Sequence, residues 1–401
     1  MPRAIICTRE LHQSGGPGLF VLGRSEESIL SLLQEYAQNV QLIYLDPPFG
    51  TGDLFRMRIG GTLIQRPAYT DILSQDAYLH MMRNVLLGCH ELLAPKGSIY
   101  LHVDYRMAAP LRMMMDELFG AGNFMNEIIW MYKSGGRSTT HFSRKHDTIL
   151  FYRKSRDVYF NIEAVGLQRG PERRNHMKRT IDDKGRVCYS IRSGGRLYTY
   201  YEDSLIYPSD VWTDIEHLHQ RDPERNGYAT QKPEALLNRI MLASSRPGDL
   251  VADLFSGSGT TAAVASKTGR RFLACDSSPF ALYALRSRQC TLHNALNLFH
   301  SPQPLELRFP ATKPDAKLCA TARLSGETYL CDVQSYTAGD GINMLAYCAL
   351  GTMDGETFLP AVYACAPTLP LSLHMPNTGY PPVLHTVDVD GRQGFFELSD
   401  N

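Results

Sequence analysis

The sequence has no long hydrophobic run, no surplus of either charge and no CxxC pair. No stretch approaches the ~18 apolar residues of a membrane span, so none is expected. The first twenty residues hold no apolar signal core, which predicts a protein that stays in the cytoplasm. Lys and Arg number 41, as do Asp and Glu, and this net charge of zero by itself indicates no polyanionic partner.

Cysteine is present but unpatterned. The nine cysteines form no CxxC and have no finger-like spacing with histidine, so we predict free thiols, a reducing compartment and no metal site. With 43 % hydrophobic and 20 % charged residues, the composition is that of a globular protein and excludes a disordered chain or a coiled coil. A length of 401 residues suits two or three domains, or one large α/β domain with additions.

The zero net charge is a cancellation between segments. Residues 131–200 contain sixteen Lys or Arg against six Asp or Glu, whereas residues 301–401 contain five against eleven. The basic segment also carries many tyrosines and phenylalanines. Basic residues interleaved with aromatic ones suit a surface that holds phosphates and stacks bases, although a solvated charged face with ordinary core aromatics fits the pattern equally well.

Strand-like and helix-like segments alternate through most of the chain. Strands are predicted at 40–45, 98–103, 126–131, 148–152, 249–255 and 271–275. Helices are predicted at 77–93, 109–119, 233–244, 260–268 and 279–293. This alternation indicates an α/β fold with a mostly parallel sheet covered on both faces. Residues 165–230 are polar and Gly/Arg-rich and predict an insertion of loops, while the last hundred residues indicate small β-rich structure.

The first motif that carries chemistry is a strand, a glycine turn and a helix. It contains the run Phe255, Ser256, Gly257, Ser258, Gly259, Thr260, and the next strand ends at Asp276. Glycines let a ligand approach the backbone, the helix start offers free N–H groups, and an acid about twenty residues later can accept both hydroxyls of a ribose. The third glycine of the dinucleotide pattern is missing, which argues against a dinucleotide. A tight turn without a ligand is the alternative.

The second motif is Asp46-Pro47-Pro48-Phe49, directly after a predicted buried strand. The two prolines restrict the backbone and remove two donors, so the carbonyls between them face outward. A carboxylate beside such a carbonyl makes a rigid pair of acceptors, suited to the two N–H donors of an exocyclic amine. Phe49 offers a ring on which a flat base could stack. An ordinary Asp-Pro turn after a strand is the alternative.

Together the two motifs resemble the DNA amino-methyltransferases, which methylate the exocyclic nitrogen of adenine or cytosine with S-adenosylmethionine. The resemblance covers roughly residues 20–295 and includes the segment Gln231-Lys232-Pro233, which in that family precedes the cofactor loop. The catalytic motif comes first and the cofactor motif follows, an order similar to the circularly permuted β class and opposite to protein glutamine methyltransferases. One departure is Gly23-Arg24-Ser25, where many relatives carry an acid after the glycine.

The resemblance implies a Rossmann-like sheet and a set of site residues. Asp46, the Pro47 carbonyl, Pro48 and Phe49 would hold a flipped-out base. The cofactor would lie against the residues 255–260, Asp276 and the segment 231–233. The basic stretch between the motifs would be the target-recognition region, with Arg173, Arg174, Lys178 and Arg179 as candidate DNA contacts. No metal is implied, because the sulfonium of the cofactor already activates the methyl group.

The predicted organisation has four parts. They are a catalytic half (1–160), a target-recognition insertion (161–227), an S-adenosylmethionine-binding half (228–300) and a β-rich acidic C-terminal domain (301–401). The expected substrate is adenine N6 in double-stranded DNA, since Asp in the tetrapeptide is a family tendency for adenine. Cytosine N4, an RNA substrate and a catalytically silent DNA-binding homologue are the alternatives. A homodimer and a restriction subunit, as part of restriction-modification, are possible partners.

Overall fold

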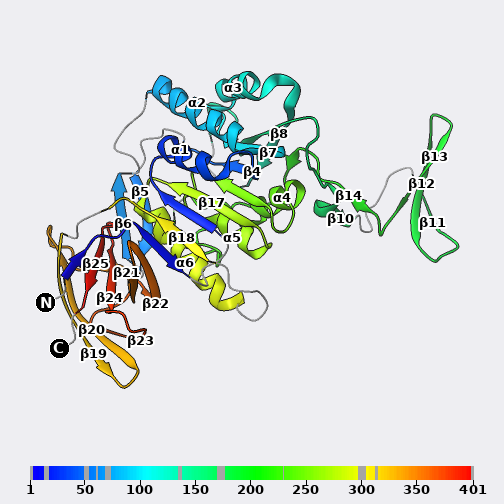
Figure 1. Ribbon diagram of the computed structural model, residues 1–401. Helices are drawn as coiled ribbons and strands as arrows, with labels where there is room; N and C mark the ends of the chain where they lie inside the picture. The colour runs from blue at the N-terminus through cyan, green and yellow to red at the C-terminus, as the bar shows by residue number, and fades with distance from the viewer. Residues whose placement is uncertain are drawn as a thin grey trace.

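One mixed sheet of fifteen strands connects the two ends of the chain (Figure 1). It is seen in a computed structural model that describes residues 3–12, 18–48, 54–59, 62–67, 74–133, 138–168, 177–228, 230–296, 304–311 and 315–398. The order across the sheet is β1-β25-β24-β21-β22-β2-β18-β3-β17-β16-β4-β7-β9-β8-β15. Strands that are far apart in the chain therefore lie side by side in one continuous surface.

The right-hand half of that order is the predicted Rossmann-like sheet. Its strands are β3 (Gly18–Leu22), β17 (Arg271–Asp276), β16 (Leu250–Asp253), β4 (Val40–Leu45), β7 (Leu93–Val103), β9 (His146–Arg153) and β8 (Phe124–Met131). The first five run parallel to one another, and β9 is antiparallel to both of its neighbours. The short β15 (Val211–Trp212) adds to β8 at the edge. The α/β fold expected from the sequence is confirmed.

Helices cover both faces of this sheet. One face packs against α1 (Ser25–Tyr36), α2 (Gln75–Leu92) and α3 (Ala108–Met115), and the other against α4 (Glu234–Ser244), α5 (Thr260–Lys267) and α6 (Pro279–Leu296). Strand β4 shows how the sequence produces this. Ile43 and Leu45 enter the first core and Leu42 and Tyr44 the second, because successive side chains of a strand point to opposite faces. A strand buried on both sides needs an unbroken apolar run.

The C-terminal strands extend the same sheet. They are β18 (Leu305–Arg308), β21 (Leu345–Asp354), β22 (Thr357–Cys365), β24 (Val383–Asp388) and β25 (Gln393–Glu397), joined by the N-terminal β1 (Arg3–Ile5) and β2 (Arg9–His12). A second sheet of β19 (Ala316–Ser325), β20 (Thr328–Ala338) and β23 (Leu371–Pro376) packs against them around a core of its own. The predicted β-rich C-terminal region is confirmed, and both chain ends lie in it (Figure 1).

The segment between residues 165 and 230 is more regular than expected. The expectation of an insertion built of loops is wrong for residues 178–201, which form an antiparallel sheet of β11 (Lys178–Ile181), β12 (Val187–Ser193) and β13 (Arg196–Tyr201). This sheet stands away from the body of the molecule (Figure 1). Because both of its faces meet solvent along much of their length, its strands lack the apolar alternation that predicts a strand. A short antiparallel pair, β10 (Leu167–Gln168) with β14 (Leu205–Ile206), connects this sheet to the body of the molecule.

Smaller differences concern the ends of elements. The helix predicted to end at residue 119 ends at Met115 and continues as one π-helical turn, Asp116–Gly120, followed by a short 3-10 turn, Ala121–Asn123. Another 3-10 turn spans Glu163–Val165. After the tetrapeptide 46–49, β5 (Leu54–Ile59) pairs with β6 (Thr62–Pro67). No helix among the described residues is long and apolar enough to cross a membrane. The four domain boundaries stay predictions.

Candidate functional site

The two motifs meet at one edge of the sheet. Strands β4 and β16 are parallel neighbours, with Leu42 opposite Val251 and Ile43 opposite Ala252. Asp46 follows the last residue of β4, and the glycine loop 255–259 follows β16. Because the carboxyl ends of parallel strands lie at the same edge of a sheet, Asp46 and the glycine loop lie close together although about 200 residues separate them in the sequence.

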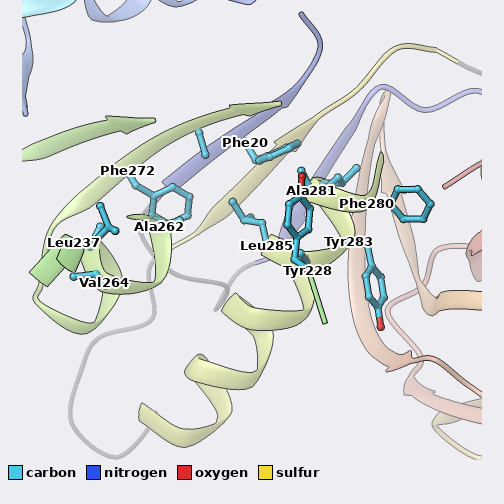
Figure 2. Close-up of a cluster of buried hydrophobic side chains, with 14 of the residues drawn as sticks. Phe20, Tyr228, Leu237, Ala262, Val264, Phe272, Phe280, Ala281, Tyr283 and Leu285 are labelled. Atoms are coloured by element: carbon cyan, nitrogen blue, oxygen red, sulfur yellow. The ribbon is translucent and has the colours of Figure 1, made fainter. Parts of the chain in front are cut away.

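Two glycines of the loop have a left-handed backbone conformation that is strained for residues with a side chain. Gly257 and Gly259 have φ of 48° and 73°, in the left-handed region, and Gly259 is the residue directly before α5. The loop is closed by hydrogen bonds from Ser256 N to the Cys275 carbonyl at 2.9 Å and from Gly259 N to the Ser256 carbonyl at 2.8 Å. A Cβ on Gly257 would lie 3.4 Å from the ring of Tyr228, which packs with the cluster in Figure 2.

Asp276 ends β17 and turns its carboxylate toward this loop. One oxygen, Oδ2, accepts a hydrogen bond from Gly257 N at 2.8 Å, and Oδ1 accepts one from Ser278 N at 2.8 Å. Burial raises the pKa of Asp276 to about 6, against the lowering effect of the backbone donors of Ser278 and Gly257. The acid predicted from its distance along the sequence therefore contacts the loop directly.

Asp46 pairs with a residue from the third predicted segment. Lys232 Nζ donates to Asp46 Oδ2 at 2.5 Å, and the two side chains are 12 % and 18 % exposed. Pro47 is buried and Pro48 half-buried, so the turn is held by its surroundings. Phe49, predicted to stack on a base, lies outside the described residues. A mostly buried carboxylate that pairs with a lysine is held in one orientation as a hydrogen-bond acceptor.

The segment 231–233 is fastened on both sides. Gln231 is 1 % exposed; its Oε1 accepts from Asn226 N at 2.9 Å and its Nε2 donates to the Glu224 carbonyl at 2.8 Å. The hydroxyl of Thr260 donates to the Lys232 carbonyl at 3.2 Å, and Pro233 directly precedes α4. These contacts bring the predicted cofactor segment, the start of α5 and Asp46 into one assembly.

Two residues of the site were missed by reasoning from the sequence. Arg288, on α6, donates from Nη1 to the Thr260 hydroxyl at 3.2 Å and from Nη2 to Glu234 Oε1 at 2.5 Å. Asp253 is the last residue of β16 and accepts from the Thr261 hydroxyl at 2.5 Å. Asp253 had a signal, an acid within an apolar strand. Arg288 had none, because its role depends on how α6 packs.

Burial gives Asp253 an unusual acidity. It raises the pKa of Asp253 to about 7, with the carboxylates of Asp46 and Asp276 adding to the rise and the hydrogen bond from Thr261 opposing it. Three aspartates thus gather at the ends of β4, β16 and β17. Among the described residues, no group of His, Cys, Asp or Glu has the arrangement of a metal site.

A partly buried chain of hydrogen bonds begins on β4, the strand that precedes Asp46. The hydroxyl of Tyr44 is 2.7 Å from His102 Nδ1, His102 Nε2 is 3.1 Å from Asp147 Oδ2, and the Tyr132 hydroxyl donates to Asp147 Oδ1 at 3.2 Å. Burial would raise the pKa of Asp147, yet the bond with His102 and the nearby charge of Lys232 lower it. This chain ties β4, β7 and β9 together below Asp46.

The position that lacks the usual acid has an acid two residues later. Gly23 N donates to the Asp276 carbonyl at 3.0 Å, and the Ser25 hydroxyl donates to the Leu254 carbonyl at 2.5 Å, so this turn borders the site. Arg24 Nε donates to Glu26 Oε1 at 2.7 Å. The carboxylate of Glu26, in the first turn of α1, therefore stands beside the position where the sequence has arginine.

The four predicted DNA contacts are divided between described and undescribed parts of the chain. Arg173 and Arg174 lie outside the described residues. Lys178 and Arg179 begin β11 and are exposed, on the sheet that stands away from the body (Figure 1). The structure therefore places them away from the 46/255–260 site, on a separate surface.

Comparison with known proteins identifies the family. The family model of N6/N4 methyltransferases, described as DNA methylase, matches residues 40–286, more than half of the chain. The chain belongs to this family. It is a DNA amino-methyltransferase, as the two motifs predicted, and the cofactor of its family is S-adenosylmethionine.

The chain is similar to several individual methyltransferases. The chain is 30 % identical to the type II methyltransferase M.EcaI of Enterobacter cloacae over 318 residues, which cover 68 % of this chain and 69 % of that one. It is 28 % identical to the DNA adenine methyltransferase YhdJ of Escherichia coli (strain K12), over 67 % of this chain and 82 % of the relative. Among solved structures, the PvuII DNA methyltransferase, described as cytosine-N4-specific, aligns over 73 % of this chain and 96 % of its own. The TM-score of this alignment is 0.45 and the sequence identity is 16 %.

The residues present fit the expected cofactor. The loop at Gly257 offers a backbone without a side chain, next to the Asp276 carboxylate. Ser256 Oγ is buried and has no hydrogen-bond partner among the described residues, as expected of a group that awaits a polar ligand. The residues of 255–260, with Asp276 and the 231–233 segment, could hold the nucleoside and amino-acid ends of S-adenosylmethionine.

Proposed function

We propose that this methyltransferase modifies the exocyclic N6 of adenine in double-stranded DNA. The observation that carries the proposal is the neighbouring position of Asp46 and the glycine loop at the ends of β4 and β16. An amine held at Asp46 would lie beside a cofactor held at residues 255–260. Adenine is favoured by the Asp form of the tetrapeptide, and YhdJ, 28 % identical, is named a DNA adenine methyltransferase.

Positioning supplies most of the catalysis in this account. S-adenosylmethionine, when bound, supplies a methyl group that its sulfonium already activates. Lys232 occupies Asp46 Oδ2, and among the described residues Oδ1 has no hydrogen-bond partner, so Oδ1 and the Pro47 carbonyl accept the two amine hydrogens. This grip directs the nitrogen lone pair toward the methyl carbon, and restricted orientation is worth several kcal/mol in such transfers.

The target base must leave the duplex to reach this edge of the sheet. Phe49 follows the two prolines and is proposed to stack on the extruded base. Lys178 and Arg179, with Arg173 and Arg174, are proposed to contact DNA from the target-recognition insertion. M.EcaI is named a type II methyltransferase, which supports a role in restriction-modification. A homodimer, a restriction subunit, a cytoplasmic location, circular permutation and the four domain boundaries stay predictions.

Nucleoside analysis tests the proposed reaction. Unmethylated plasmid DNA is incubated with the full chain and S-adenosylmethionine, digested, and analysed by mass spectrometry. We expect N6-methyladenine, formed by the wild type and absent with Asp46→Ala. N4-methylcytosine would overturn the base assignment. Methylation of structured RNA in preference to the plasmid would overturn the substrate class, and binding of plasmid without methylation would indicate a silent homologue.

A further inference from the structure

The separate sheet β11–β13 changes width along its length. Lys178 to Ile181 of β11 pair with residues 187–190 of β12, so this part has three strands. Residues 191–193 and 196–198 pair with each other alone, and Gly194 and Gly195 close them with φ of 56° and 77°. The segment 191–198, called the ribbon below, is a two-stranded hairpin with the narrow turn that two glycines allow.

The ribbon carries two arginines, Arg192 and Arg196. Arg192 and Arg196 flank the glycine turn, both are exposed, and among the described residues neither has an ion-pair partner. By contrast Arg186, at the opposite turn of the same sheet, pairs with Asp182 at 3.0 Å. Arg192 lies opposite Leu197 and Arg196 opposite Ser193, so the two guanidinium groups start from opposite faces of the hairpin.

Apolar and aromatic side chains accompany these cations. Leu197 is 62 % exposed and Tyr198 is 43 % exposed. Arg196, Tyr198 and Tyr200 follow one another on one face of β13, because alternate residues share a face. Residues 178–200 hold six Lys or Arg against two Asp. The surface along the ribbon is therefore basic, partly aromatic and exposed.

We propose that the ribbon enters the major groove of duplex DNA with its Gly194-Gly195 turn leading, so that Arg192 on one face and Arg196 on the other both reach guanine base edges. This inference rests on the proposed function. The major groove, about 12 Å wide, admits a two-stranded β-ribbon, whereas the third strand would prevent the rest of the sheet from entering. Arg is the side chain that binds the O6 and N7 acceptors of guanine in a bidentate manner. Tyr198 and Leu197 would contact the groove wall, and Lys178 the adjoining phosphates.

Guanine N7 chemistry tests this placement. The probe is a random-sequence 40-base-pair duplex, used either intact or after methylation of guanine N7, an acceptor in the major groove. We expect N7 methylation to weaken binding by the full chain about tenfold or more, since each bidentate contact contributes about 1–3 kcal/mol. The variant Arg192→Ala/Arg196→Ala should bind the intact duplex at least about tenfold more weakly and should no longer distinguish the two duplexes.

Matched measurements separate this inference from the proposed function. Lys184→Ala removes one positive charge at the opposite turn, against two in the double variant, and should bind within about twofold of the wild type. Affinity for S-adenosylmethionine should be the same in all variants. If the wild type methylates plasmid DNA but the double variant binds and discriminates as the wild type does, the ribbon assignment is wrong. If the wild type binds S-adenosylmethionine but neither binds nor methylates DNA, the proposed function itself fails.

Discussion

Lys232 Nζ lies 2.5 Å from Asp46 Oδ2, although 186 residues separate the two in the chain. The pair joins the proposed catalytic turn after β4 to the segment that leads into α4, and the Lys232 carbonyl accepts a hydrogen bond from Thr260 at the start of α5. One residue thus contacts the proposed base-binding group with its side chain and the proposed cofactor loop with its backbone. Substitutions at this junction should affect methyl transfer more than folding.

The first prediction concerns this ion pair. Lys232→Met should lower kcat/KM for DNA methylation by at least about tenfold, because Asp46 would lose the partner that orients it, worth about 1.5–3 kcal/mol for a charged hydrogen bond. The control is Lys96→Met, which removes a solvent-exposed pair with Asp157 at 3.0 Å and should change kcat/KM less than twofold. Equal kcat/KM for Lys232→Met and the wild type would contradict the orienting role.

The second prediction concerns Arg288, which links Thr260 to Glu234. Arg288→Met should raise the Kd for S-adenosylmethionine about fivefold or more while leaving kcat at saturating cofactor within about twofold, because the loop would lose a tether without losing a reacting group. Isothermal titration and initial rates measure the two effects. Arg83→Met, which breaks an exposed pair with Glu117, is the control. A fall in kcat with an unchanged Kd would contradict a role in holding the loop.

The third prediction concerns the pH dependence of stability. In the folded protein the pKa of Asp253 is about 7, above the ordinary value of ~3.9 that it regains on unfolding. Between these values the folded state holds a proton that the unfolded chain has released, so the free energy of unfolding should fall as pH rises through this window. Above pH 7 the loss is complete.

Asp253→Asn tests this linkage. The amide side chain does not titrate between pH 5 and pH 8, and its oxygen can still accept the hydrogen bond from Thr261. Chemical denaturation at pH 5 and pH 8 should show a smaller fall in the free energy of unfolding for the variant than for the wild type. The expected difference is on the order of 1 kcal/mol or more, since one pKa unit corresponds to ~1.36 kcal/mol. Parallel curves for the two proteins would show that Asp253 titrates normally.

The fourth prediction concerns the junction between the sheet halves. Arg286 Nη2 donates to Glu10 Oε2 at 2.5 Å, and both side chains are almost fully buried, 1 % and 0 % exposed. Glu10→Gln should lower the free energy of unfolding by about 3–5 kcal/mol, because a buried cation would lose its charged partner. Arg3→Ala, which removes the exposed pair with Glu397, should cost at most ~1 kcal/mol. Similar costs for the two would contradict a buried ionic junction.

Ion pairs inside the acidic C-terminal region change how its charge is interpreted. Part of its acidity is used internally: Arg392 contacts Asp340 at 2.8 Å and Asp388 at 2.7 Å, and Asp388 is fully buried. One of the five basic residues of this region thus pairs with two of its eleven acidic residues. An acidic count alone does not show that this region repels DNA.

Local patterns predicted the part of the fold that local physics determines. The apolar run at 40–45 is a strand because both of its faces are buried, and the glycines at 257 and 259 have the positive φ that a strand-to-helix turn requires. The sheet 178–201 escaped prediction because both faces meet solvent and its side chains show no alternation. Contacts such as Lys232 to Asp46 and Arg288 to Thr260 depend on tertiary packing and leave no trace in spacing.

The most direct test of the central claim is the single-turnover rate of methyl transfer by Asp46→Asn at saturating S-adenosylmethionine. Asp46 is proposed to hold the amine beside the cofactor loop, whereas the cofactor is proposed to bind at residues 255–260 and Asp276. We expect a rate lower by at least about a hundredfold with an unchanged Kd for S-adenosylmethionine. The single oxygen of Asn would accept from Lys232 and its N–H₂ would face the amine, and losing one positioned hydrogen-bonding group in a transition state costs about 10²–10³ in rate. A rate equal to that of the wild type would contradict the account.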